Sequence, residues 1–144
     1  MTNLSVNVNK IAWLRNARGE DRPNLIELSK ILIESGVHGL TVHPRPDLRH
    51  ITPDDVHDLS LLCKEKEVEF NIEGNPYSEQ THTYPGFLNL VKEIMPDQCT
   101  LVPDSPDQLT SDHGWEIQAK EHEAIRSIVE ELQTDKTRVS FFVD

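Results

Sequence analysis

The sequence lacks the features that mark several common classes of protein. It has no run of about 18 apolar residues, so we expect neither a transmembrane helix nor a membrane partner. Its first ten residues, MTNLSVNVNK, have neither the basic start nor the long apolar stretch of a signal peptide. The two cysteines, Cys63 and Cys99, are far apart and lack the spacing of a metal site. Because free thiols are usual in the cytoplasm, we expect a cytoplasmic protein.

Basic residues are also scarce. The chain has 14 lysines and arginines against 25 aspartates and glutamates, which gives a net charge of −11 at pH 7. A surface this acidic repels phosphate backbones and anionic lipids, so we do not expect nucleic acid as a partner. With 144 residues, 36% of them hydrophobic and 27% charged, the chain has the length and composition of one soluble globular domain.

Strand-like and helix-like segments alternate along the chain. The predicted strands are 4–8, 39–43, 68–73, 98–102 and 137–143, and the predicted helices are 23–36, 52–66, 85–95 and 115–133. This alternation predicts an α/β protein with a parallel sheet, either doubly wound or closed into a barrel. No G-x-G-x-x-G motif follows the first strand, so nothing directly supports a dinucleotide-binding fold.

Helix starts are marked by side chains that can cap them. Asn24 can cap the helix 23–36, and Glu27 follows it three residues later. Thr52 can cap the next helix, with Pro53 in the first turn. We expect the segment between the first strand and residue 23 to be a loop, and its Lys10, Arg15 and Arg18 either to bind an anion or to be simply solvated.

Polar residues recur in pairs, two positions apart, at the ends of the first three predicted strands. The pairs are Asn7 and Asn9, His43 and Arg45, and Asn71 and Glu73. A two-residue step places both members on one face of a strand. In barrel enzymes the active site is built at the carboxyl-terminal ends of the strands. The pattern therefore favours a TIM (β/α)8 barrel over an open sheet.

Two of these residues suit proton transfer. His43 ends its strand and is expected to face Glu73 on the next one. A carboxylate on an inner strand face is costly to bury, and its pKa would be set by burial and by His43 or Arg45. An ordinary ion pair between Glu73 and Arg45 remains an alternative. The loop 101–115 after the fourth strand is long and is expected to close over a ligand.

Four stretches together resemble the pyridoxine 5′-phosphate synthase family, and the resemblance runs through all 144 residues in order. The stretches are NVNKIAWLRNARG (7–19), GLTVHPRPDLRHI (39–51), FNIEGNP (70–76) and TLVPDSPDQLTS (100–111). The resemblance implies a TIM barrel that condenses 1-deoxy-D-xylulose 5-phosphate with 3-amino-2-oxopropyl phosphate. It also implies that neither a metal nor an organic cofactor takes part.

The same resemblance implies roles for individual residues. His43 and Glu73 fall on positions that accept protons. Asn7 and Arg18 fall on contacts to the aminoketone phosphate, whereas Arg45, His50 and Thr110 fall on contacts to the deoxyxylulose phosphate. Asn9 and Lys10 stand where the family commonly has Asp-His, another contact to the deoxyxylulose phosphate, and some members also carry Asn-Lys.

A complete barrel needs eight βα units and about 250 residues. We predict only five strands and four helices, so residues 1–144 are expected to be the N-terminal portion of a single barrel domain. The family's later half should carry a glutamate on strand six, a histidine proton donor in a Gly-His-Gly loop and a glycine-rich phosphate loop. We therefore expect an inactive fragment, with an open sheet edge that favours a homo-oligomer.

Two other functions are compatible with the residues alone. The first is an α/β module that binds phosphate groups without catalysing a reaction. The second is a metal-dependent barrel hydrolase that uses His43, His50 and Glu73 as ligands, although Asn7 and Asn9 occupy the places where such enzymes carry paired histidines.

Overall fold

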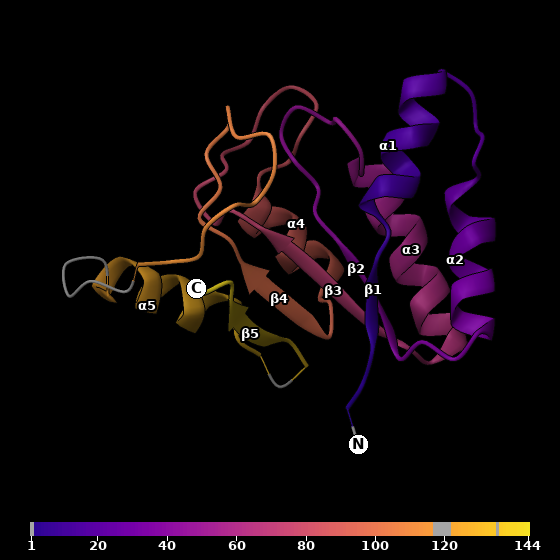
Figure 1. Cartoon of the computed structure of the whole chain (residues 1–144). Helices are drawn as coiled ribbons and strands as arrows, with labels where there is room; N and C mark the ends of the chain where they lie inside the picture. The colour runs from indigo at the N-terminus through magenta and orange to yellow at the C-terminus, as the bar shows by residue number, and fades with distance from the viewer. Residues whose placement is uncertain (1, 117–121, 135) are drawn as a thin grey trace.

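The structure is a computed structural model, and it describes residues 2–116, 122–134 and 136–144. Its centre is a parallel five-stranded sheet in the order β1-β2-β3-β4-β5 (Figure 1). The strands are β1 (Ser5–Asn7), β2 (Gly39–Val42), β3 (Glu69–Gly74), β4 (Gln98–Leu101) and β5 (Arg138–Phe141). Each strand pairs with the next strand in the sequence, which is how consecutive units of a TIM barrel are arranged. The α/β prediction of an incomplete barrel and its five strands are confirmed.

Five helices accompany the strands. They are α1 (Asn9–Arg18), α2 (Leu25–Glu34), α3 (Pro53–Lys66), α4 (Phe87–Ile94) and α5 (His122–Leu132). Figure 1 shows α4 behind the sheet, α1, α2 and α3 on the right beyond β1, and α5 beside β5. Within the described ranges, no helix is long and apolar enough to cross a bilayer.

Both predicted helix caps are present. The Asn24 side chain accepts a hydrogen bond from the backbone N–H of Glu27 at 2.8 Å. At the start of α3, the Thr52 hydroxyl accepts from the backbone N–H of Asp55, and the Asp55 carboxylate accepts from that of Thr52. This reciprocal pair is a capping box, which satisfies two N–H groups that the helix itself leaves unpaired.

The segment after β1 was predicted to be a loop, and this prediction is wrong. Residues 9–18 form α1, which ends at Gly19 with a φ of 71°. Alanine, leucine, lysine and arginine favour helices, and the segment has no glycine or proline before its end. Ala12 is fully buried against the core, so tertiary packing adds to this local preference.

The last helix also differs from its prediction. A helix over 115–133 was expected, but Trp115 and Glu116 are not helical, and α5 is described only from His122. The part of the prediction that covers 117–121 lies outside the described residues. The Trp115 side chain turns back to the sheet instead, and its Nε1–H donates to the carbonyl oxygen of Leu101 at 2.9 Å.

The two faces of the sheet differ in chemistry. The face toward the helices is apolar and belongs to the core, with Leu40, Val42, Phe70, Ile72, Cys99 and Leu101 all buried. Burial of these side chains is the main stabilising contribution to the fold, because the free energy scales with the apolar area removed from water.

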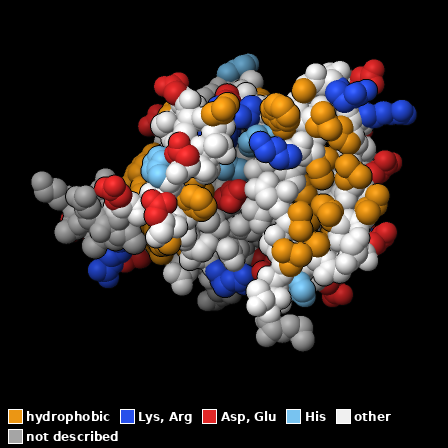
Figure 2. Space-filling view, viewed as in Figure 1, with side chains coloured by type: hydrophobic (Ala, Val, Ile, Leu, Met, Phe, Trp, Pro, Cys, Tyr) orange, Lys and Arg blue, Asp and Glu red, His pale blue; other side chains and the backbone are white. Residues whose placement is uncertain are grey.

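The other face carries a row of polar side chains, one from each strand. Ser5 bonds Thr41 at 2.8 Å, Asn71 links Thr41 to Thr100 at 3.3 and 3.0 Å, and Thr100 bonds Ser140 at 2.8 Å. Figure 2 views this face and shows hydrophobic side chains gathered over α1 and α2. No helix within the described ranges covers this face, which in a closed barrel would be the interior.

Candidate active site

The functional side chains predicted at the carboxyl ends of the strands converge there. His43 follows β2, and Glu73 is the fifth residue of β3. The register pairs Val42 with Ile72, so the next residue of each strand lies side by side on the polar face. His43 Nδ1 is 3.9 Å from Glu73 Oε1, which brings the two predicted proton acceptors together.

Glu73 is held in a state that can exchange a proton near neutral pH. Burial, and then the negative charge of Asp104, raise its pKa to about 7. Asn7 Nδ2 donates to Glu73 Oε1 at 2.8 Å and opposes this rise, because the hydrogen bond favours the carboxylate. A group with such a pKa can both accept and donate protons at physiological pH.

His43 is neutral at physiological pH. Its side chain is 6% exposed, and burial followed by the charges of Arg45 and His50 lowers its pKa to about 3. Of the two residues expected to transfer protons, only Glu73 therefore has a pKa near neutral. The backbone N–H of His43 donates to Asn9 Oδ1 at 2.8 Å, which fixes the strand end against the start of α1.

Arg45 is buried and already paired. Its guanidinium forms an ion pair with Asp104, and its Nη1 donates to the carbonyl oxygen of Gln108 at 3.0 Å. Asp104 lies in the loop after β4, so this pair ties that loop to the loop after β2. The alternative that Arg45 forms its ion pair with Glu73 is therefore wrong in this structure, because Asp104 takes that place.

Sequence reasoning missed Asp104, which is 4% exposed and lies 3.7 Å from His43 Nε2. In the sequence it is one of three aspartates in the loop 101–115. One signal in the sequence could have identified it. Steps of two residues lead from Thr100 through Val102 to Asp104, which places Asp104 on the same face as Thr100 of β4. The step is less obvious here because an apolar valine separates the two polar residues.

His50 lies beside the site. Its ring centroid is 6.3 Å from that of His43, and its Nδ1 accepts from the backbone N–H of Ile51 at 2.9 Å. Burial, then Arg45 and Arg49, lower its pKa to about 4, and the charge of Lys10 contributes to the same shift. His50 therefore serves as a neutral hydrogen-bonding group rather than as a cation at pH 7.

Other predicted residues lie further out. Lys10 is exposed, with its Nζ 5.6 Å from the Trp13 ring centroid, and Arg18 is exposed at the end of α1. Thr110 is exposed in the loop after β4. Arg15, grouped with Lys10 and Arg18 as an anion-binding cluster, instead forms a bidentate pair with Asp55 at 2.6 and 2.8 Å.

A small cavity of about 80 Å³ lies next to His43 and Arg45. Its lining also includes Asn75, Ser78 and Asp104, but not Glu73. Ligand pockets usually measure about 300–1,000 Å³, so this cavity is the closed end of a site whose other side is the open polar face.

A larger hollow of about 540 Å³ lies at the opposite end of the sheet, between α3 and α4. Ser60, Leu61, Lys64, Phe70 and Met95 are among its lining residues. Sites in α/β barrels lie at the carboxyl ends of the strands, so we place the candidate site at His43 and Glu73 despite the smaller volume there. In residues 2–116, 122–134 and 136–144, no group of three histidine, cysteine, aspartate or glutamate side chains could hold a metal ion.

Comparison with known proteins identifies the family. A family model described as pyridoxal phosphate biosynthesis protein PdxJ matches residues 4–144. The chain belongs to this family. A pyridoxine 5′-phosphate synthase of Xylella fastidiosa strain 9a5c is 52% identical over 143 residues, covering 99% of this chain and 55% of that protein. One from Xanthomonas axonopodis pv. citri strain 306 is 50% identical, covering 99% and 56%.

These matches confirm the resemblance found in the sequence motifs. The chain spans about half the length of the PdxJ relatives it matches. Among solved structures, a beta-mannanase from Thermomonospora fusca superposes with a TM-score of 0.47 at 13% identity, covering 100% of this chain and 59% of that one. That likeness is too slight to support an inference about fold or function.

Proposed function

We propose that residues 1–144 form the N-terminal portion of a pyridoxine 5′-phosphate synthase. The reaction would condense 1-deoxy-D-xylulose 5-phosphate with 3-amino-2-oxopropyl phosphate. The observation that supports this most is the pair of His43 and Glu73, 3.9 Å apart at the strand ends of a chain about half identical to synthases of this name. Oligomer formation with further copies of the chain stays a prediction.

Proton transfer is the chemistry for which the pair is suited. Joining an amine to a ketone and then removing water needs a group that takes up a proton and returns it. Glu73, with its pKa near 7, can do both, and Asn7 keeps its carboxylate oriented. His43 is neutral and supplies a second acceptor beside it. The proposed chemistry uses protein side chains and no cofactor.

Substrate phosphates would be held by the polar and basic groups around this pair. Arg45 has five N–H donors, of which Asp104 and the carbonyl of Gln108 occupy two, so its guanidinium can still bind a phosphate oxygen. We assign Arg45 to 1-deoxy-D-xylulose 5-phosphate. The same substrate would be contacted by His50, Lys10, Asn9 and Thr110. Asn7 and Arg18 are assigned to the aminoketone phosphate.

Residues 1–144 alone should not make the product. The matched relatives are nearly twice as long, and the polar face of the sheet has no covering element within the described ranges. A reaction with charged intermediates needs a site closed to water. We therefore propose that the remaining strands and a proton donor must come from the part of the barrel that this chain does not contain.

A complementation assay tests this proposal. The 144-residue chain is mixed with a separately purified polypeptide comprising the part of the Xylella fastidiosa synthase beyond the match, and both substrates are added. We expect no pyridoxine 5′-phosphate from either polypeptide alone and measurable turnover from the mixture. Turnover by the 144-residue chain alone would show that the fragment proposal is wrong.

Substrate binding by the chain alone provides a second test. NMR titration of 15N-labelled chain with 1-deoxy-D-xylulose 5-phosphate should shift the amide signals of residues 43–50, and Arg45→Ala should weaken binding. The matched control is Arg126→Ala, since Arg126 is exposed on α5, where it pairs with Glu130. Binding without turnover in the complemented mixture would favour the non-catalytic phosphate-binding module. Metal found in purified protein would favour the hydrolase alternative.

A further inference from the structure

Asp104 lies between the Arg45 guanidinium and the His43 ring. Its Oδ2 accepts hydrogen bonds from the Arg45 guanidinium and, at 2.8 Å, from the Ser111 hydroxyl. The same oxygen lies 3.7 Å from His43 Nε2. Its Oδ1 is buried and makes no hydrogen bond to the described residues. A carboxylate this enclosed is costly unless its charge is matched, which the Arg45 pair achieves.

We propose that Asp104 is a positioning residue of this site. Its carboxylate holds the Arg45 guanidinium in place and fixes the His43 ring so that Nε2 carries the proton and Nδ1 faces Glu73 with a lone pair. The catalytic meaning of this arrangement rests on the proposed function, whereas the arrangement itself can be tested without any substrate.

The tautomer follows from the charges on the two sides of the ring. A neutral imidazole has one N–H and one acceptor nitrogen, and the N–H is favoured on the side that faces a negative charge. Asp104 lies on the Nε2 side, and the Glu73 carboxyl lies on the Nδ1 side. With a pKa of about 7, Glu73 can present an O–H to Nδ1 at neutral pH. Asp104 instead presents the carboxylate that pairs with Arg45.

Asp104 also acts on Glu73 through space. Its negative charge disfavours the carboxylate form of Glu73, and it is the largest contribution to the raised pKa after burial. Several other ionisable groups face this cluster. They are Lys10 from α1, and Arg45, Asp47, Arg49 and His50 from the loop after β2.

The position of Asp104 is maintained by its backbone as well as by its side chain. Asn75 Nδ2 donates to the backbone carbonyl of Asp104 at 2.6 Å, from the loop after β3. Substitution of the carboxylate therefore leaves this anchor intact. An Asp104→Asn variant removes the charge and keeps the shape, and Asp104→Glu keeps the charge at the end of a longer side chain.

The first test needs no variant. The 15N chemical shifts of the His43 ring nitrogens, measured on the labelled 144-residue chain at pH 7, should show a protonated Nε2 and an unprotonated Nδ1. A protonated Nδ1 would overturn the proposal. Turnover plays no part in this measurement, so its failure would leave the proposed function to be judged by the complementation assay.

The second test uses the variants. In Asp104→Asn, the pKa of Glu73, followed by 13C NMR of its carboxyl, should fall by on the order of one pH unit, and the His43 ring should lose its preference for Nε2–H. Asp104→Glu should restore both readings at least in part.

The matched control is Asp55→Asn, because Asp55 also pairs with an arginine but lies at the start of α3. It should leave Glu73 and His43 unchanged. If Asp104→Asn folds and leaves both readings as in the unsubstituted chain, or if Asp55→Asn changes them equally, Asp104 is not a positioning residue.

Discussion

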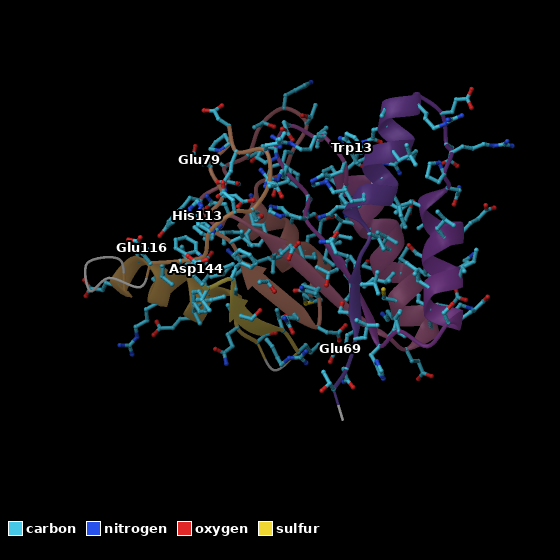
Figure 3. All side chains as sticks on the ribbon, viewed as in Figure 1. Trp13, Glu69, Glu79, His113, Glu116 and Asp144 are labelled. Atoms are coloured by element: carbon cyan, nitrogen blue, oxygen red, sulfur yellow. The ribbon has the colours of Figure 1, made fainter. Side chains whose placement is uncertain are left out.

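Glu73 and Glu69 show how strongly position along one strand determines the properties of a carboxylate. Both lie on the polar face of β3, four residues apart. Figure 3 shows Glu69 at the lower end of the sheet, far from the loops that carry Glu79 and His113 above the other end. Glu69 is 45% exposed and pairs with Arg138 at 2.9 Å, whereas Glu73 is 21% exposed and accepts from Asn7.

The difference comes from the neighbours and not from the strand. At the carboxyl end, the loops after β2 and β4 bring His43, Arg45 and Asp104 around Glu73, so its carboxyl group is largely buried and charges act over short distances. At the amino end, a single exposed ion pair is screened by solvent. The surroundings at the carboxyl end therefore raise the pKa of Glu73.

The largest effect should separate these two glutamates. In the complemented enzyme, Glu73→Gln should lower turnover by about 10²–10⁴-fold, because an acid–base group is lost while the shape is kept. The matched Glu69→Gln should leave turnover within about twofold. Steady-state rates of pyridoxine 5′-phosphate formation measure both. Equal losses in the two variants would contradict the assignment of Glu73.

A comparison of the two faces of the sheet should give the next largest effect. Leu40→Ala on the apolar face should lower the free energy of unfolding by about 2–5 kcal/mol, because it leaves a cavity in a fully buried site. Thr41→Val, one residue later on the polar face, should cost only about 1 kcal/mol, since it removes hydrogen bonds to Ser5 and Asn71 while keeping the volume. Urea unfolding followed by circular dichroism gives both values, and a reversed order would show that the polar row carries the stability.

The pH dependence of stability should distinguish Glu73 from Glu69. Folding raises the pKa of Glu73 from 4.5 to about 7, so the folded chain binds more protons than the unfolded chain between these values, and stability falls as pH rises through this range. His43 acts in the opposite direction, because its lowered pKa removes stability as pH falls from 6.5 toward about 3.

Above pH 6.5 the contribution of Glu73 is isolated by comparing variants, because His43 and His50, whose pKa values are lowered from 6.5, still gain stability there as pH rises. Between pH 6.5 and 8 the chain should lose roughly 1 kcal/mol of unfolding free energy through Glu73. Glu73→Gln should remove this loss, and Glu69→Gln should retain it. Urea denaturation at several pH values provides the measurement, and an unchanged slope in Glu73→Gln would argue against a raised pKa.

The smallest effect is expected at the amino end of the sheet. Arg138→Ala breaks an ion pair with Glu69 in which both side chains are about half exposed. It should change the free energy of unfolding by at most about 0.5 kcal/mol, and less in high salt. A loss as large as that of Leu40→Ala would mean that the two ends of β3 are more alike than their exposure indicates.

Much of this architecture could be predicted from local sequence patterns. The five strands follow from alternating apolar runs, and the caps at Asn24 and Thr52 follow from side chains next to helical segments. The pairing of His43 with Glu73 followed from a two-residue step on neighbouring strands. The helix α1 was missed because its basic residues suggested an anion-binding loop, although the same residues favour helix formation.

The βα alternation, the polar parity of the strand ends and membership of the PdxJ family can be recognised in the amino-acid sequence, because each depends on short-range patterns or on motifs. Which charges meet depends on how distant segments pack together. Asp104 lies 59 residues from Arg45 in sequence, and it pairs with Arg45 in place of Glu73, which sequence analysis had left open as an alternative partner. The same folding buried His43 beside cations and Glu73 beside an anion, which moved their pKa values in opposite directions. Burial and through-space charge depend on how loops pack, and no local pattern in the chain specifies that packing.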